Sequence, residues 1–384
     1  MSGFVTPELE QQAISWRRHL HSHPELSFQE VETAAFVEET LRSFDGLELE
    51  RPTRTSVVAR LRGARPGRVL ALRADMDALP IDEATGLEFA SRRPGVMHAC
   101  GHDAHTAMLL AAARTLAARR DVLAGEVRFV FQHAEETPPG GARELVEAGV
   151  MDGVDLVIGG HVASDKPVGR IGAHAGPFAA AADSFSAVVR GRGGHAALPH
   201  ETIDPVVVAA HVVTGLQSLV SRTVDPMKNA VVSVTRIHGG TADNIVPEAV
   251  ELGGTVRTFD EELRAAMAER LERVLRGVTG AHGATYELDY RYGYAPVIND
   301  ADAAAVVRAA ASAELGEDAL IDVEPIMGGE DFSAYLARAP GAFFWVGAGG
   351  AGAIPHHHPQ FVIDESALRA GIAVFVRTAL DFLA

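Results

Sequence analysis

Residues 97–117 read MHACGHDAHTAMLLAAARTLA. This stretch begins with cysteine, histidine and aspartate side chains, which commonly bind metal ions, and continues into an alanine-rich segment. We predict a helix over about Ala104–Arg120. Apolar runs typical of buried strands occur on both sides of it, at Arg68–Ala74, Glu126–Gln132 and Asp155–Gly159. Strands that alternate with helices predict an α/β fold with a mostly parallel sheet.

The pattern changes near Ala180. From there the expected order is β-α-β-β-α-β, that of a small ferredoxin-like α+β sandwich. Its expected strands are Ser184–Val189, Val231–Ile237, Val250–Arg257 and Thr285–Tyr290, with helices over about 204–221 and 261–278. After Ala295 the first pattern returns. We therefore predict a discontinuous domain, residues 1–180 and 294–384, with an inserted domain at residues 181–293.

The net charge limits the kinds of partner. The chain has 51 acidic and 34 basic side chains, and its formal net charge is −17. Such a field repels phosphate backbones and anionic lipids, so we expect no nucleic-acid and no membrane partner. The start, MSGFVTPELEQQ, lacks the features of a signal peptide, and no apolar run approaches a span of about 20 residues. A single cysteine fits a reducing compartment, so we expect a cytoplasmic protein.

Side chains that commonly bind metal ions follow the expected strands or precede an expected helix. Cys100 and His102 are two residues apart, so an extended backbone would put both on one side. His161 and His357 each come after a further expected strand. In open α/β sheets ligands gather at the carboxyl ends of the strands, so we expect these side chains to meet there.

Two adjacent glutamates, Glu135 and Glu136, follow the strand that ends at Gln132. On an extended chain they would face opposite ways. Glu136 would then bind metal while Glu135 stays free to act as a base.

Five side chains are thus candidate ligands: Cys100, His102, Glu136, His161 and His357. A catalytic zinc takes three protein ligands and a water, so five suit two neighbouring divalent ions better. Thiolate and imidazole ligands favour Zn, Mn, Co or Ni over Mg²⁺ or Ca²⁺.

Each of these side chains also has a simpler explanation. A lone buried cysteine is usually a small core residue. A lone histidine at a strand end is usually hydrogen-bonded, and adjacent glutamates usually lie on a solvated loop. Asp75 and Asp77, which follow the expected strand at Val69–Leu72, either orient metal ligands or cap the strand end.

Motifs along nearly the whole chain resemble those of the M20 amidohydrolases, in the branch of bacterial aminoacylases, hippurate hydrolases and plant auxin-conjugate hydrolases. In the family's order the stretches are RRHLHSHPELSFQE (17–30), ALRADMDALPI (71–81), MHACGHDAHTAMLL (97–110), FQHAEE (131–136), GRGGHAALPH (191–200), IDPVVVAA (203–210), DNIVPE (243–248), GTVRTFD (254–260), GGEDFSAYL (328–336) and HHPQFVIDE (357–365).

The resemblance implies that the five candidate ligands hold two metal ions and that Glu135 is the general base. It implies that His195 and Asn244 reach the substrate carbonyl from the inserted lid domain, and that Arg257 lies near the substrate. A substrate carboxylate would suit Arg257, or the N-terminus of the helix expected after the turn at Gly329.

The chain departs from the family at three positions within or beside these motifs. It has His133 where proline is common, His356 where leucine is common and Gly329 where serine is common. Because His356 and His358 flank His357, a neighbouring histidine is an alternative ligand.

The expected reaction is hydrolysis of the amide bond of N-acyl amino acids, with an acetyl, benzoyl or similar acyl group. A metal-activated water attacks, Glu135 transfers its proton, and His195 stabilises the oxyanion. One alternative is a metallo-dipeptidase or carboxypeptidase on the same scaffold. Another is a non-catalytic metal-binding or ligand-binding protein. The absence of Glu135 would indicate such a protein, and Glu135 is present.

The inserted domain has helices on one face of its sheet only, so an edge or a helix side is free to pair. The resemblance implies a homodimer, or an oligomer built from dimers, in which His195 serves the partner's site.

Overall fold

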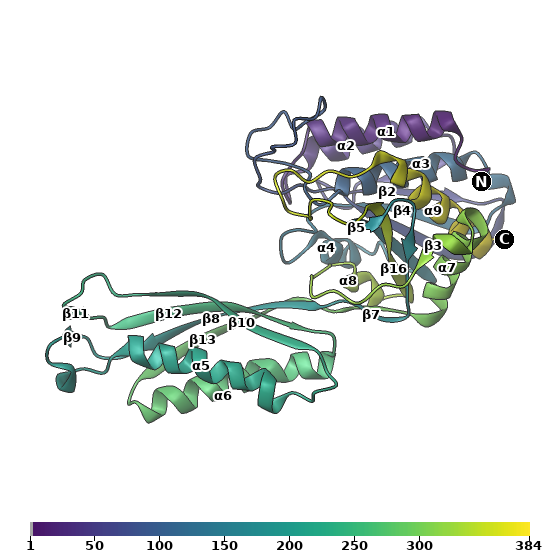
Figure 1. Ribbon diagram of the computed structural model, residues 1–384. Helices are drawn as coiled ribbons and strands as arrows, with labels where there is room; N and C mark the ends of the chain where they lie inside the picture. Colours follow the sequence, from purple (N-terminus) through teal and green to yellow (C-terminus); the bar gives the residue numbers. More distant parts are fainter. Residues whose placement is uncertain (1–2) are drawn as a thin grey trace. The chain divides into compact units, whose positions relative to one another are not determined.

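The computed structural model describes residues 3–384, which form two compact units. The first contains residues 3–178, 298–324 and 331–384, and the second contains residues 179–297 and 325–330. Both ends of the described chain, Gly3 and Ala384, thus belong to the first unit, and the second comes almost entirely from the middle of the chain (teal to green in Figure 1).

An eight-stranded sheet runs through the first unit in the order β1-β2-β4-β3-β5-β16-β6-β15. Its strands are β1 (Leu47–Glu50), β2 (Val57–Arg62), β3 (Arg65–Asp75), β4 (Ala124–Gln132), β5 (Leu156–Pro167), β6 (Ile171–Gly172), β15 (Leu320–Ile321) and β16 (Gly341–Gly349). The central strands β4, β3, β5 and β16 are parallel, whereas antiparallel pairs join β1, β2 and β4 at one edge and β16 to β6 at the other. The predicted mostly parallel sheet is therefore confirmed.

The helices of the first unit are α1 (Pro7–Ser22), α2 (Val31–Arg42), α3 (His102–Ala117), α4 (Gly141–Glu147), α7 (Ala301–Leu315), α8 (Ser333–Leu336) and α9 (Leu368–Phe382), with 3-10 turns at Arg120–Val122, Glu317–Ala319 and Glu365–Ala367. Nearly every side chain of α3 is buried. Its alanines let α1, α9 and the sheet approach closely. At Gly371 a Cβ would lie 2.1 Å from the sulfur of Met108, so α9 crosses α3 where α9 has no side chain.

Parallel register brings the strand ends of the first unit together. Asp75, the last residue of β3, is paired with Gln132, the last residue of β4. Two expectations need correction here. His161 lies within β5, which runs on to Pro167, and α3 begins at His102 rather than Ala104.

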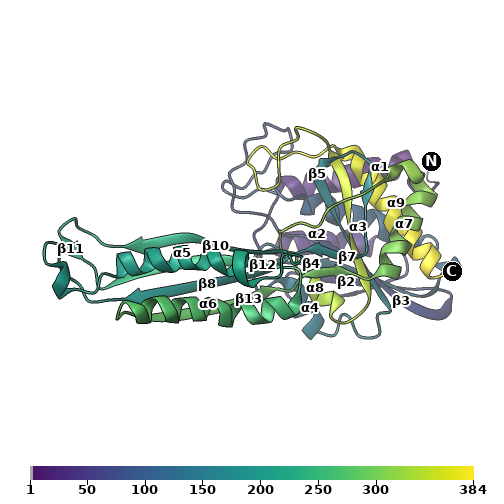
Figure 2. The ribbon, with the colours of Figure 1, turned by 60° about the horizontal axis from the view of Figure 1, so that its bottom comes forward.

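The second unit has a four-stranded antiparallel sheet in the order β10-β12-β8-β13. Its elements are β8 (Ala181–Arg190), β9 (Gly194–His195), a 3-10 turn at Pro199–Glu201, α5 (Pro205–Thr223), β10 (Ala230–Gly239), β11 (Ile245–Val246), β12 (Ala249–Thr258), α6 (Glu261–Ala281) and β13 (Thr285–Tyr294). The sheet strands and the two helices follow the predicted β-α-β-β-α-β order. Helices α5 and α6 lie side by side along these strands (Figures 1 and 2).

Two short pairs complete the strands. β9 pairs with β11, and β7 (Gly176–Ala179) pairs with β14 (Val297–Asn299). The pairing of β9 with β11 sets His195 opposite Ile245.

Helix α5 is 19 residues long and, by length and composition alone, apolar enough to cross a membrane, contrary to the expectation that no run approaches that length. Its buried apolar positions include Val208, Val212, Leu216 and Leu219, which belong to the core of the second unit together with residues of α6 and of the sheet. The apolar side of α5 therefore has a partner within its own unit, and the helix is weak evidence for a membrane span.

Candidate metal centre and active site

The segment between Cys100 and His102 is a turn, not the extended chain that was expected. Gly101 has a φ of 94°, and a Cβ on it would lie 2.4 Å from the Val162 side chain. Glycine is the residue that adopts this backbone without strain. The turn still brings both side chains to one place, because Cys100, His102 and His161 offer ligand atoms within 4.8 Å of one another.

His161 faces Cys100 in a form suited to a ligand. Its Nδ1–H donates to the carbonyl of Val162 at 2.7 Å, and its Nε2 lies 3.3 Å from the Cys100 sulfur. Burial lowers the pKa of His161 well below its ordinary value, so the ring is neutral. Burial, and then the charge of Glu136, raise the pKa of the Cys100 thiol. A thiolate at this place needs a cation beside it, as a metal ion would provide.

His102, the first residue of α3, is oriented by a carboxylate. Its Nδ1 lies 3.1 Å from Asp77, and its buried Nε2 has no hydrogen-bond partner within residues 3–384. Burial lowers the pKa of His102, but the carboxylates of Asp75 and Asp77 outweigh it and raise that pKa to about 10. The carboxylates that would hold a proton on this ring would equally favour a metal ion at Nε2.

The two glutamates after β4 lie on a turn rather than on the extended chain that was expected. Ala134, just before them, has a φ of 50°, so the extended chain assumed from the sequence ends there. Glu135, Glu136 and His102 offer ligand atoms within 4.8 Å of one another. Both carboxylates therefore reach the same cluster.

The loop after β16 carries three successive histidines, and one of them reaches the cluster. The Nε2 of His357 lies 3.3 Å from Oε1 of Glu136, and Cys100, Glu136 and His357 form another group of converging ligand atoms. The Nε2 of His356 accepts instead from the Ser164 N–H, and the Nδ1 of His358 accepts from the Gln360 N–H. The geometry thus favours His357 over its neighbours.

The donor set of this cluster suits a transition metal. Three of the groups of converging ligand atoms are linked in pairs, through Cys100, His102 or Glu136, and together they contain all five candidate ligands and Glu135. Such an ion is bound by thiolate, imidazole and carboxylate groups, and the cluster contains all three kinds. They surround the buried Nε2 of His102, which has no hydrogen-bond partner within residues 3–384.

His105 and Arg73 support the cluster, and neither role was predicted from the sequence. His105 Nδ1–H donates to Asp75 at 2.6 Å, and its Nε2 accepts from the Val162 N–H at 2.8 Å, so neither ring nitrogen is left for a metal. Arg73 contacts Asp75 at 2.6 Å and Asp331 at 2.9 Å. Burial raises the pKa of Asp75, but the guanidinium of Arg73 holds it well below its ordinary value. The spacing of His102 and His105, one helical turn apart, was the signal available.

The candidate substrate residues of the second unit fall into two places. His195 and Asn244 are exposed and adjacent, since Ala196 N–H donates to the carbonyl of Asn244. Arg257 and Gly329 are also neighbours, because a Cβ on Gly329 would lie 3.4 Å from Nη1 of Arg257. The helix expected after Gly329 is α8, with four residues, which is too short to offer an N-terminal anion site.

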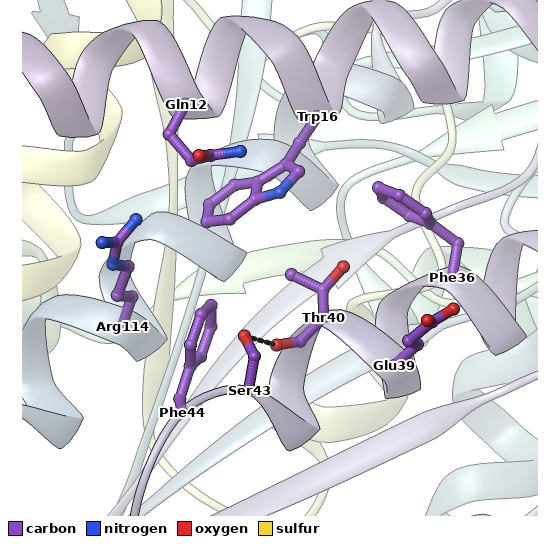
Figure 3. A pocket seen from close by; sticks show the side chains of 8 residues that line it. All are labelled: Gln12, Trp16, Phe36, Glu39, Thr40, Ser43, Phe44 and Arg114. Carbon is purple, nitrogen blue, oxygen red and sulfur yellow. Dashed lines mark hydrogen bonds between the residues drawn. The ribbon is translucent and has the colours of Figure 1, made fainter.

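A surface pocket of about 480 Å³ lies between α1, α2 and α3 (Figure 3). Trp16, Phe36 and Phe44 line it, with Arg114 and Glu39 on opposite sides. It contains none of the candidate ligands and is separate from the metal centre.

Comparison with known proteins places this site in a family. Residues 71–381 match the family described as Peptidase family M20/M25/M40. The chain is 60% identical over 295 residues to an N-acyl-L-amino acid amidohydrolase of Geobacillus stearothermophilus, covering 77% of this chain and 80% of that protein. It is 41% identical over 382 residues to thermostable carboxypeptidase 1 of Saccharolobus solfataricus, covering 98% and 96%.

A solved structure from Bacillus subtilis, described as a dinuclear metal binding peptidase from the M20 family, matches with a TM-score of 0.87 and 40% identity over 98% of this chain and 99% of that one. The chain therefore belongs to peptidase family M20/M25/M40, as its motifs predicted. It is a metal-binding enzyme that hydrolyses amide bonds.

One buried acid beside the site gives a test by pH. Glu30 is fully buried, and burial followed by the charge of Asp77 raises its pKa from 4.5 to about 8. As pH rises, the unfolded chain loses this proton first, so the folded state is progressively destabilised between about pH 4.5 and 8. Glu30→Gln removes the titration. Its free energy of unfolding, relative to the original protein, should rise over this range and then level off. Denaturant unfolding of both metal-free proteins from about pH 5 to 9 measures the difference, and a constant difference would contradict the raised pKa.

Proposed function

We propose that the chain hydrolyses the amide bond of N-acyl amino acids and releases a carboxylic acid and a free amino acid. The observation that carries the proposal is the buried cluster of converging sulfur, nitrogen and oxygen ligand atoms in the first unit. The name of the Geobacillus relative supports an N-acyl amino acid as the substrate. The acyl group would be acetyl, benzoyl or a similar one.

Two divalent ions, drawn from Zn, Mn, Co and Ni, fit the cluster. Cys100, His102, Glu136, His161 and His357 would hold them, with Asp75 and Asp77 orienting the ligands. When bound, such ions supply a water that is acidic enough to act as a nucleophile near neutral pH.

Glu135 would move the protons of the reaction. Its carboxylate is nearly buried and converges with His102 and Glu136, so it lies beside the ligands without being needed as one of the five. In this place it takes the proton of the attacking water and delivers it to the leaving amine. The developing oxyanion needs a donor, which is the role of His195.

Arg257 would bind the substrate's carboxylate. Its guanidinium is half-buried and forms no ion pair within residues 3–384, and burial lowers its pKa. A half-buried cation that forms no ion pair of its own, although the charge of Asp183 acts on it, is a natural partner for a carboxylate ligand. At Gly329 a side chain would contact this guanidinium and Ala182, so glycine keeps the guanidinium accessible.

Distances within the second unit support a dimer. Arg257 is paired with Ala182 at one end of the sheet, whereas β9 and β11 lie beyond the end at which Ala249 pairs with Arg190 (Figures 1 and 2). The eight residue-to-residue steps along β12 from Ala249 to Arg257 span roughly 26 Å, since each step advances about 3.3 Å.

A small substrate at Arg257 cannot also touch His195 and Asn244 of the same chain across that span. A second copy that supplies these residues removes the difficulty. In this arrangement residues 1–180 and 294–384 form the catalytic domain, and residues 181–293 form a lid and dimerisation domain. We place the enzyme in the cytoplasm, without nucleic-acid or membrane partners.

A peptidase is the second candidate function, favoured by the similarity to the Saccharolobus carboxypeptidase. Its substrate also carries a carboxylate next to the scissile amide, so the same side chains would serve. Rates on N-acetyl and N-benzoyl amino acids, compared with free dipeptides, distinguish the two.

The roles of the two glutamates can be separated by substitution. Glu135→Gln should retain the metal and the fold but lower kcat by at least about 10²–10⁴-fold, because proton transfer is lost. Glu136→Gln should instead lower the metal content. Elemental analysis and steady-state kinetics of both variants make the test. Reversed behaviour would show that the two roles are exchanged, and an active Glu135→Gln would exclude it as the base.

Complementation tests the shared site. His195→Ala and Glu135→Gln should each be nearly inactive alone. If His195 acts on the partner's site, a mixed dimer has one site with both defects and one with neither. After the variants are unfolded and refolded together, about half of the dimers are mixed, so roughly a quarter of the original activity should return. Mixing shown by differently tagged subunits, without recovered activity, would show that His195 does not act in the partner.

A further inference from the structure

The turn that carries Glu135 and Glu136 starts from a strained residue. Ala134 is fully buried, and its φ of 50° is in the left-handed region that residues with a Cβ rarely adopt. Such a conformation persists only where surrounding contacts determine it. The contacts that determine this one therefore set the direction in which both glutamates point.

A short N-terminal segment, Ser27–Glu30, supplies three contacts to this region. The Ser27 hydroxyl donates to Oδ2 of Asp77 at 2.7 Å, and that same oxygen accepts the Glu136 N–H at 2.9 Å. The Phe28 ring meets the His133 ring edge-on, with centroids 5.6 Å apart.

The third contact reaches the strained residue itself. Oε1 of Glu30 accepts the Ala134 N–H at 2.7 Å, across 104 residues of chain. The other oxygen of Glu30 is buried and has no hydrogen-bond partner within residues 3–384. Burying an acid is unfavourable because the side chain loses its hydration. A buried acid at this position is therefore expected to have a functional role.

The chemistry of Glu30 suits an acceptor that need not be charged. In the metal-free protein, burial and the neighbouring charge of Asp77 raise its pKa to about 8, which favours the protonated acid at neutral pH. Its Oε1 then acts as a carbonyl oxygen toward Ala134. It adds no negative charge to a region that already contains Asp77, Glu135 and Glu136.

We propose that Glu30 is a positioning residue, which holds Ala134 in its left-handed conformation and thereby directs Glu135 and Glu136. The proposal rests on the function proposed above for this turn. Without the acceptor, the Ala134 N–H would be buried and unpaired, and the backbone would gain by relaxing to a common conformation. Relaxation would rotate Glu135 away from its working position, and a misplacement of about 1 Å can lower a rate 10²-fold.

Three variants make the primary test. Glu30→Met keeps the length of the side chain but replaces the oxygen by a thioether, which is only a weak acceptor, and its kcat should fall about 10²-fold with KM within about three-fold. Glu30→Gln keeps an acceptor oxygen for Ala134, so it should retain kcat within about three-fold. Glu25→Met is the matched control. It removes a buried acid that accepts the Thr33 N–H at 2.8 Å, so it should lower the melting temperature while leaving kcat unchanged.

A second pair of variants covers the case in which Glu30→Met does not fold. Glu30→Asp keeps the acid but withdraws it by one methylene, so kcat should fall at least about ten-fold. In the Ala134→Gly background, the left-handed conformation carries no strain. There Glu30→Asp should lower kcat several-fold less than it does beside Ala134, a coupling that general destabilisation does not produce.

Each outcome decides the matter. Folded Glu30→Met or Glu30→Asp with kcat within two-fold of the original would overturn the proposal. So would equal losses in Glu30→Gln and Glu30→Met, or the same loss of kcat in Glu25→Met. Glu135→Gln, measured alongside, separates the two levels. If it is active, the proposed function of the turn fails, whereas an inactive Glu135→Gln beside an active Glu30→Met refutes only the role of Glu30.

Discussion

The hydrogen bond between Asp77 and His102 is the interaction on which the metal centre depends. Several carboxylates are buried where β3 and β4 end, and buried charges need compensation. Asp75 and Asp331 share the guanidinium of Arg73, and Asp103 has Arg17. Asp77 has no arginine partner in the described chain. Its balancing group is the His102 imidazole, whose other nitrogen faces the ligand cluster.

Asp77 also ties together segments that lie far apart in the sequence. One of its oxygens contacts His102 at the start of α3, and the other accepts from Ser27 and from the Glu136 N–H. The N-terminal segment, the helix and the carboxylate turn are thus fixed by one side chain. A cation at the cluster would complete the compensation that the protein side chains leave partial.

The sequence predicted the parallel sheet, the order of the sandwich and the groups of metal-type residues, because those features depend on local periodicity and spacing. It did not predict how the backbone turns at Gly101, Ala134 and His357, each of which has a positive φ. For Ala134 and His357 this conformation depends on contacts across the fold, such as the bond from the His357 N–H to the Ala99 carbonyl. The supporting roles of His105 and Glu30 were not predicted from the sequence for the same reason. Their three partners in the structure, the Asp75 carboxylate and the N–H groups of Val162 and Ala134, are remote in sequence.

Anomalous X-ray diffraction from crystals loaded with zinc or manganese locates the ions directly. We expect two peaks per chain, roughly 3.5–4 Å apart, bounded by Cys100, His102, Glu136, His161 and His357. Nε2 of His102 should bind one of them while its Nδ1 still faces Asp77. A single ion, or two ions that leave Nε2 of His102 without a metal, would contradict a dinuclear centre built on this pair.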